Sequence, residues 1–186
     1  PESVKLFVDQ AVSQLEYDKR RGSTRLNAAF SVLLEPFESL SGLVLRHLLQ
    51  DKIPRTNDER KYYFEPYIDG VEGWLKNELF KHQRNLRKNV LYQAHSNRIG
   101  NLLFCLSFAG DPQYAGLQIG GVWDDVALAF ADPDLQAIRP ELIEMNEFRN
   151  NSVVHIENPI TDSVLAEKQL RQWIAGLIRL ARYLGS

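Results

Sequence analysis

The chain has 186 residues, of which 44% are hydrophobic and 25% are charged. This composition excludes a disordered or collagen-like chain, and the length suits one domain with a packed core. We therefore expect a single domain over residues 1–186, which is either a whole protein or a domain excised from a larger one. The net charge of −2 argues against a domain that coats nucleic acid indiscriminately, but it is compatible with a local basic patch.

The sequence holds one cysteine, Cys105, so no disulfide can form within the chain and no zinc or iron–sulfur site can be built from cysteines. A reducing compartment is the natural location, and the cytoplasm fits best. The longest nearly apolar stretch, Leu102 to Gly110, is about half of the ~20 residues that a transmembrane helix requires. We expect no membrane span, no cofactor and no metal site.

Apolar residues at spacings of three and four predict helices through most of the chain, and no apolar/polar alternation indicates a sheet. The first helix covers residues 4–15, and a longer one covers 26–48 along a seam close to a heptad repeat. Pro36 lies inside this seam, where we expect one bent helix or two collinear helices. A third helix is predicted from about Tyr67 to about Asn85, and a fourth from about Arg98 to Ala109.

The second half of the chain opens with the longest expected loop, the glycine-rich stretch from Gly110 to Gly121. Two helical turns are predicted from Trp123 to Phe130. Pro140 suits the first turn of the next helix, and Asp162 is expected to cap the last one, which has an apolar stripe from Leu170 to Leu184. The pattern predicts an all-α, multi-helix up-and-down bundle that ends in a helical hairpin turning around residues 149–162.

Several single residues are expected to serve packing. Trp74, Trp123 and Trp173 occupy positions at or near the apolar stripes, so we assign all three to the core. Cys105 is expected to be a buried, unreactive thiol. His47 is expected to lie in the core or in an interface.

A short motif occurs where the last two helices are predicted to meet: Arg149, the polar Asn150 directly after it, four further residues, and His155. In a helical chain of this size the motif resembles that of HEPN domains, a superfamily of small α-helical bundles. There an arginine is followed after four to six residues by a histidine, with Asn, Asp or His favoured next to the arginine. The resemblance covers the C-terminal hairpin well and the rest loosely, with inserted helices and a glycine-rich loop.

The resemblance implies a metal-independent endoribonuclease whose active site forms where two copies of the motif meet in a homodimer. It implies RNA products with 2′,3′-cyclic phosphate and 5′-OH ends. His155 would be the general acid/base, Arg149 would hold the scissile phosphate, and Asn150 would assist. Such domains resemble toxins and effectors of antiviral defence, whose regulatory or sensor domain would here lie outside the chain.

The spacing of the motif sets a geometric requirement. On an ideal α-helix Arg149 and His155 would lie about 120° apart around the axis and about 9 Å apart along it, so they would not share a face. Either the helix loosens within residues 150–152, or two protomers supply the residues across a shared cleft. Asn and Ser in this stretch compete for backbone hydrogen bonds, and the two valines after them are β-branched, so the helix is locally weak.

A purely structural interpretation of the motif stays open beside the catalytic one. In it, His155 caps the end of the helix, where a cation is favoured, and Arg149 pairs with a nearby carboxylate. The acidic candidates are Glu144, Glu147 and Glu157.

Residues 76–98 hold six basic residues and one acid, Glu78. Lys81, Arg84 and Lys88 can share a helical face there and are the candidates for contact with an RNA backbone, with a solvated charged face as the alternative. Residues 123–169, which include the motif, hold ten acidic and three basic residues. Acidic residues around the motif repel RNA, which is a polyanion. The catalytic hypothesis therefore calls for a dimer that brings the basic segment over the cleft.

Two functions of other classes stay open. One is a non-catalytic helical module that dimerises or docks a partner through the seam of the second helix or the stripe from Leu170 to Leu184. The other is an RNA- or nucleotide-binding domain that uses Lys81, Arg84 and Lys88 without cleavage, and whose binding depends on salt.

Overall fold

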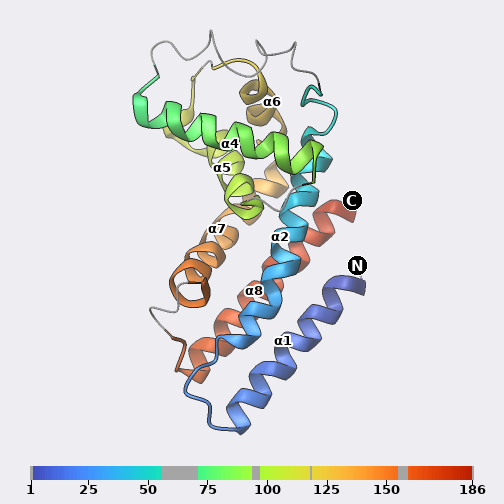
Figure 1. Cartoon of the computed structure of the whole chain (residues 1–186), viewed down its shortest axis with the longest axis vertical. Coiled ribbons are helices and arrows are strands. Elements are labelled where there is room, and N and C mark those ends of the chain that lie inside the picture. Colours follow the sequence, from blue (N-terminus) through green and yellow to red (C-terminus); the bar gives the residue numbers. More distant parts are fainter. Residues whose placement is uncertain (1, 56–70, 94–96, 118, 155–158, 186) are drawn as a thin grey trace. The chain divides into compact units, whose positions relative to one another are not determined.

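The computed structural model describes residues 2–55, 71–93, 97–117, 119–154 and 159–185. Over these residues it contains seven α-helices and no strand, which confirms the all-α fold class. The helices are α1 (Glu2–Arg20), α2 (Ala28–Leu49), α4 (Gly73–Leu91), α5 (Arg98–Gly110), α6 (Val122–Ala129), α7 (Pro133–Phe148) and α8 (Ser163–Gly185) (Figure 1). A 3₁₀ turn at Pro112–Tyr114 interrupts the glycine-rich loop, and a π-helical segment at Arg149–Val154 follows α7.

The chain divides into two compact units. Unit 1 consists of residues 1–40 and 138–186, and unit 2 consists of residues 41–137. The points where the chain passes from one unit to the other lie within α2 and α7. The single domain expected over residues 1–186 stays a prediction.

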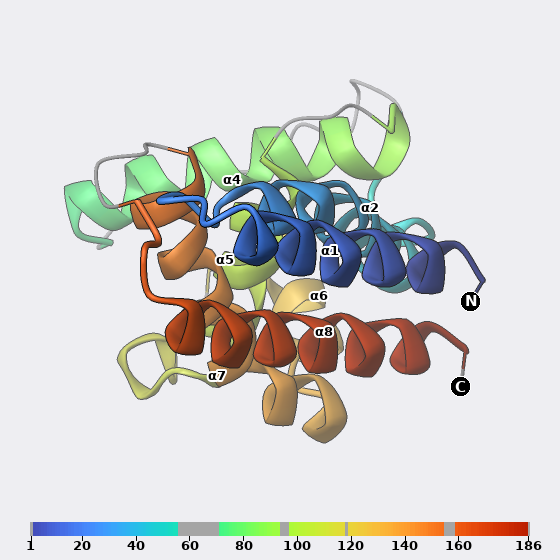
Figure 2. The ribbon, with the colours of Figure 1, turned by 90° about the horizontal axis from the view of Figure 1, so that it is seen from below.

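In unit 1, α1 and α8 lie side by side and run in opposite directions (Figures 1 and 2). The core beside them is aromatic. The ring of Trp173 on α8 lies 5.5 Å from Phe30 and 6.0 Å from Phe37, both on α2, and 6.2 Å from Phe148 at the end of α7. Phe30 and Phe148 are themselves 5.0 Å apart. These tilted and edge-on contacts, which aromatic pairs prefer, join α2, α7 and α8.

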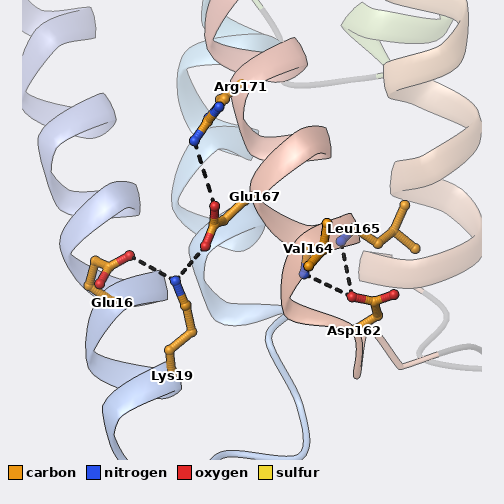
Figure 3. A network of polar contacts seen from close by, with 7 residues as sticks. All are labelled: Glu16, Lys19, Asp162, Val164, Leu165, Glu167 and Arg171. Atoms are coloured by element: carbon orange, nitrogen blue, oxygen red, sulfur yellow. Dashed lines mark hydrogen bonds and ion pairs between the residues drawn. The ribbon is translucent and has the colours of Figure 1, made fainter.

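Helix α8 begins at a side-chain cap. The backbone N–H groups of Val164 and Leu165 donate to Oδ1 of Asp162 at 2.8 and 3.2 Å (Figure 3). This satisfies two of the four N–H groups that lack a partner within the helix, and it confirms the predicted cap.

An ion-pair network joins α1 to α8 in the same region of unit 1. Lys19 contacts Glu16 on its own helix and Glu167 on α8, and Glu167 also pairs with Arg171 (Figure 3). The carboxylates raise the pKa of Lys19, and Lys19 lowers the pKa of Glu167. Because these groups are at least partly exposed to water, we expect them to add little stability.

In unit 2, α5 packs against α4 and α6. The ring of Trp123 on α6 lies 5.6 Å from Phe104 and 5.0 Å from Phe108, both on α5. Cys105, between these phenylalanines, is fully buried, and burial raises the pKa of its thiol. The expected buried thiol and the expected core positions of Trp123 and Trp173 are thus confirmed.

Three helix boundaries can be compared with expectation. Helix α5 matches its prediction, whereas α4 runs from Gly73 to Leu91, so it begins six residues after the expected start near Tyr67 and ends six residues beyond Asn85. Helix α7 begins at Pro133, so the placement of Pro140 in a first turn was wrong. Asp132 supplies the reason, because its Oδ1 accepts from the N–H groups of Asp134 and Leu135 at 2.9 and 3.1 Å. This cap starts the helix early, and Pro140 is tolerated in its interior.

Helix α2 is continuous through Pro36, so the chain forms one helix here and not two collinear ones. Phe30, Leu33, Phe37 and Val44 of its heptad-like seam are fully buried, so the seam belongs to the core of the described chain. Among the described residues α2 is the one helix that is long and apolar enough to cross a membrane by length and composition. More than half of its most apolar window is buried within the protein, and the core helix of a globular fold passes the same test.

Two residues assigned to packing lie elsewhere. Trp74 is 54% exposed, so its assignment to the core was wrong. It directly precedes the buried Leu75 on α4, and successive residues of an α-helix point about 100° apart, so on this partly covered helix Leu75 faces the core and Trp74 faces solvent. His47 is exposed on α2, which excludes a core position for it.

Candidate functional site

The motif begins at the end of α7. The ring of Phe148 is held between Phe30 and Trp173, and the next residue, Arg149, starts the π-helical segment that runs to Val154. In a π-helix the hydrogen bonds join residues five apart, so the turn is wider than in an α-helix, and such segments are frequent at functional sites. The helix therefore loosens over the residues that were expected to weaken it.

The guanidinium of Arg149 makes two polar contacts within unit 1. Nη1 donates to Oδ1 of Asn150 at 3.0 Å, and Nη2 donates to Oε1 of Glu38 on α2 at 3.4 Å. The Arg149 side chain is 23% exposed, and its Nε is buried with no partner among the described residues. Among the described contacts, one N–H on Nη1 and one on Nη2 are left over for an anion, since the Nε–H is buried.

The acidic partner of Arg149 differs from the expected ones. Glu38 takes this place, whereas no ion pair joins Arg149 to Glu144 or Glu147, and Glu157 lies outside the described residues. Aromatic packing explains the choice. Phe37 and Phe148 both contact the indole of Trp173, so the residues that follow them in sequence, Glu38 and Arg149, are brought together.

Asn27, which the sequence alone did not identify, contacts the backbone before and after the segment that contains His155. The amide of Asn27 donates through Nδ2 to the carbonyl of Ser152, and its Oδ1 accepts from the N–H of Ile160 at 3.2 Å. The N–H of Leu26 also donates to the carbonyl of Ile160 at 2.8 Å. The chain is thus fixed on both sides of residues 155–158. His155 itself lies outside the described residues.

The signals for these two additional residues were weak in the sequence. Asn27 precedes an apolar run and could be taken for an ordinary helix cap. Glu38 is one of many acidic residues, and it is separated from Arg149 by 111 positions. Both become visible only once α2 and α7 are packed together.

The predicted RNA-binding residues lie on α4 in unit 2. Lys81, Arg84 and Lys88 are all exposed. Lys81 contacts Glu78 at 3.4 Å, whereas Arg84 and Lys88 have no ion pair within the described chain. The wider basic segment is not a single surface, because Arg98 is buried and donates to the carbonyl of Gln93 at 2.8 Å.

His82, which lies in the same basic segment, is a core residue. Its ring stacks on Phe104 with centroids 4.0 Å apart, its Nδ1 lies 2.6 Å from Oδ1 of Asn101, and its Nε2 lies 3.4 Å from Glu78. Burial lowers the pKa of His82. A neutral ring that donates from Nδ1 satisfies the Asn101 carbonyl, so His82 serves as a buried polar link between α4 and α5.

The structure thus brings Arg149 and Asn150 together in unit 1, and Lys81, Arg84 and Lys88 together in unit 2. Within the described ranges no group of three or more His, Cys, Asp or Glu residues could hold a metal ion. No protein-family model, no curated protein and no solved structure matches the chain. The HEPN resemblance therefore rests on the motif and on the helical fold.

Proposed function

We propose that the chain is a metal-independent endoribonuclease of the HEPN type that cleaves RNA with Arg149, Asn150 and His155. The observation that carries the proposal is the pairing of Arg149 with Asn150 at the start of a π-helical segment. The spacing of the motif calls for a departure from α-helical geometry between its arginine and its histidine, and the π-helical segment is such a departure.

The chemistry follows from the residue types. The 2′-OH of the RNA attacks the adjacent phosphorus, its proton passes to a base, and the bond to the 5′-oxygen breaks as that oxygen gains a proton. His155 is suited to these proton transfers near neutral pH. Arg149 donates to the non-bridging phosphate oxygens, where negative charge builds up. The products are a 2′,3′-cyclic phosphate and a 5′-OH, and DNA is not cleaved because it lacks the 2′-OH.

Glu38 and Asn150 act on Arg149 as positioning residues in this scheme. Glu38 accepts from Nη2 at 3.4 Å, and Asn150 accepts from Nη1 at 3.0 Å. These contacts orient the guanidinium and leave the second N–H group of each nitrogen for the phosphate. Asn27 fixes the backbone on either side of the segment that contains His155. Two copies of the motif in a homodimer supply one histidine for each of the two proton transfers.

The test compares the purified chain with its Arg149→Ala and His155→Ala variants on mixed cellular RNA in the presence of EDTA. Arg171→Ala is the matched control, because it removes an exposed guanidinium from α8 in the same unit. We expect the parent and the control to cleave RNA, and the two motif variants to be slower by roughly 10²–10⁴-fold, the usual effect of losing a general acid or base. Cleavage by His155→Ala at the rate of the parent would overturn the proposal.

The non-catalytic docking hypothesis makes a different demand on α2. It needs the heptad-like seam to be available to a partner, but Phe30, Leu33 and Phe37 of the seam are completely buried in unit 1. Charges placed there would unfold the protein and would not report on docking. The buried seam therefore argues against docking through α2.

A further inference from the structure

Helix α4 presents a row of aromatic and basic side chains on its exposed side. Trp74 in its first turn is 54% exposed, and Tyr92 at its C-cap is 65% exposed. They are 18 positions apart, which is about five full turns of an ideal α-helix, so their positions fall on the same side of α4. Lys81 and Lys88 lie within about 40° of the line that joins them, and Arg84 lies within about 80°. We call these five residues the α4 face.

The α4 face carries a net positive charge with little internal compensation. Glu78 is the one carboxylate in α4, and it is shared between Lys81 and the ring of His82. Glu72 at the N-cap accepts from the indole N–H of Trp74. Arg84 and Lys88 have no ion-pair partner among the residues that the structure describes. Two charged side chains are thus available to an anionic ligand, and a third is only weakly held at 3.4 Å.

We propose that the α4 face binds single-stranded nucleic acid. Cations placed between two exposed aromatic rings are the combination that single-strand binders use, since phosphates contact the cations and unpaired bases stack on the rings. In a duplex the bases already stack on one another and offer no free face to the two rings. The α4 face is about 27 Å long, which is the length of roughly eight stacked nucleotides.

This proposal does not depend on the cleavage proposal. The α4 face lies in unit 2, and the Arg149 motif lies in unit 1. Binding without cleavage, and cleavage without binding at the α4 face, are separate outcomes. An oligonucleotide that carries 2′-O-methyl groups keeps them apart, because it has the bases and phosphates but no 2′-OH to act as a nucleophile.

The experiment titrates the full chain with a 2′-O-methyl oligouridylate of about twelve nucleotides, within the range of known single-strand site sizes. Tryptophan fluorescence is a specific reporter, because Trp123 and Trp173 are fully buried and Trp74 is exposed. We expect the oligonucleotide to quench the fluorescence of the parent but not that of Trp74→Phe. This variant should keep most of the affinity, because phenylalanine retains an aromatic ring at position 74. A deoxyribonucleotide strand of the same length should bind similarly, since it shares the phosphates and the base faces.

Two sets of variants separate stacking from charge. Trp74→Ala combined with Tyr92→Ala is expected to weaken binding at least fivefold. Replacing Lys81, Arg84 and Lys88 by glutamine is expected to reduce the slope of log affinity against log salt by about 2, which is 0.7 for each lost phosphate contact. The matched controls are Tyr17→Ala and a triple glutamine variant of the exposed Lys5, Lys168 and Arg171 in unit 1.

Three results would overturn the proposal. The first is unchanged affinity of the double aromatic variant. The second is a duplex or a polyglutamate chain that binds as tightly as the single strand, since charge alone would then explain binding. The third is an equal loss of affinity in the triple glutamine control, which would show that only the net charge of the protein matters.

Discussion

The two units use aromatic side chains in different ways. In unit 1, Trp173 gathers three phenylalanines, and the polar residues that follow Phe37 and Phe148 form the Glu38–Arg149 pair at the half-exposed edge of that cluster. In unit 2, the aromatic cluster around Phe104 includes His82, so the polar group is stacked inside the core. Aromatic packing thus leaves a charged group at a partly exposed edge in one unit and encloses a titratable group in the other.

This difference indicates where chemistry can take place. A half-exposed arginine with unused donors can bind a phosphate, whereas a buried imidazole with satisfied hydrogen bonds contributes to stability. The buried His82 is therefore not the histidine that the ribonuclease proposal needs. In unit 2 the α4 face, which we propose to bind single strands, lies on the exposed side of α4, away from the buried side of that helix.

Removing the central tryptophan of either unit should have the largest effect on the free energy of unfolding. Trp173→Ala and Trp123→Ala each delete a fully buried indole, and we expect each to lower the free energy of unfolding by about 3–5 kcal/mol. Urea denaturation followed by circular dichroism measures the loss. Trp173→Phe is the milder control, since it keeps a ring against the phenylalanines. A loss below about 1 kcal/mol for either alanine variant would show that its indole does not organise the core.

The buried imidazole of unit 2 should make stability depend on pH. Because burial lowers the pKa of His82, the unfolded chain takes up a proton at a higher pH than the folded chain does. Its contribution to stability is then full above the ordinary value of 6.5 and falls as the pH drops below it, by at most about 1.4 kcal/mol per pH unit.

Urea denaturation at several pH values between 5 and 8 tests this sign. The comparison is with His82→Gln, which retains an amide for Asn101 but does not titrate. We expect the stability of the parent to fall more steeply than that of the variant as the pH is lowered. Parallel pH profiles would mean that His82 titrates normally in the folded protein.

Loss of the Asp162 cap of α8 should have an intermediate effect on the free energy of unfolding. Asp162→Ala leaves the N–H groups of Val164 and Leu165 without their acceptor, and we expect a loss of about 1 kcal/mol. Asp162→Asn keeps an acceptor and should recover most of this loss. Thermal or urea denaturation of the two variants side by side measures the difference, and an equal loss in both would point to the charge of Asp162 instead of its hydrogen bonds.

The smallest change in stability, with a clear change in activity, is expected from Glu38→Gln. The ion pair with Arg149 is partly exposed, so its loss should change the free energy of unfolding by less than about 1 kcal/mol. Cleavage of RNA should slow, because Arg149 loses the contact that orients it. Glu147→Gln, an exposed neighbour of the motif, is the control and should behave as the parent does. Equal rates in all three proteins would remove Glu38 from the proposed site.

Local sequence signals predicted the local features of this fold. The periodicity of apolar residues located the helices, Asp162 was identified as a cap, and the Asn and Ser residues after Arg149 indicated where the helix would loosen. Two local signals compete for the start of α7, and the stronger one prevails in the structure. Pro140 was placed at a helix start that Asp132 and Pro133 in fact determine.

Features that depend on tertiary packing could not be predicted in this way. The pairing of Glu38 with Arg149 joins residues 111 positions apart and follows from the contacts of Phe37 and Phe148 with a common indole. Trp74 and Leu75 are both apolar, and only the packing of α4 decides that Leu75 faces the core. The spacing of apolar residues defines an apolar stripe along a helix. Which residues at the edge of that stripe are buried depends on the helices that pack against it.

The most direct test of the ribonuclease proposal is a comparison of two RNA substrates of identical sequence, one unmodified and one fully 2′-O-methylated, incubated with the chain in EDTA. We predict that only the unmodified RNA is cut, that its fragments end in 2′,3′-cyclic phosphate and 5′-OH, and that His155→Ala cuts neither. Cleavage of both substrates, fragments with 3′-OH ends, or intact unmodified RNA even when the chain is dimeric would contradict it.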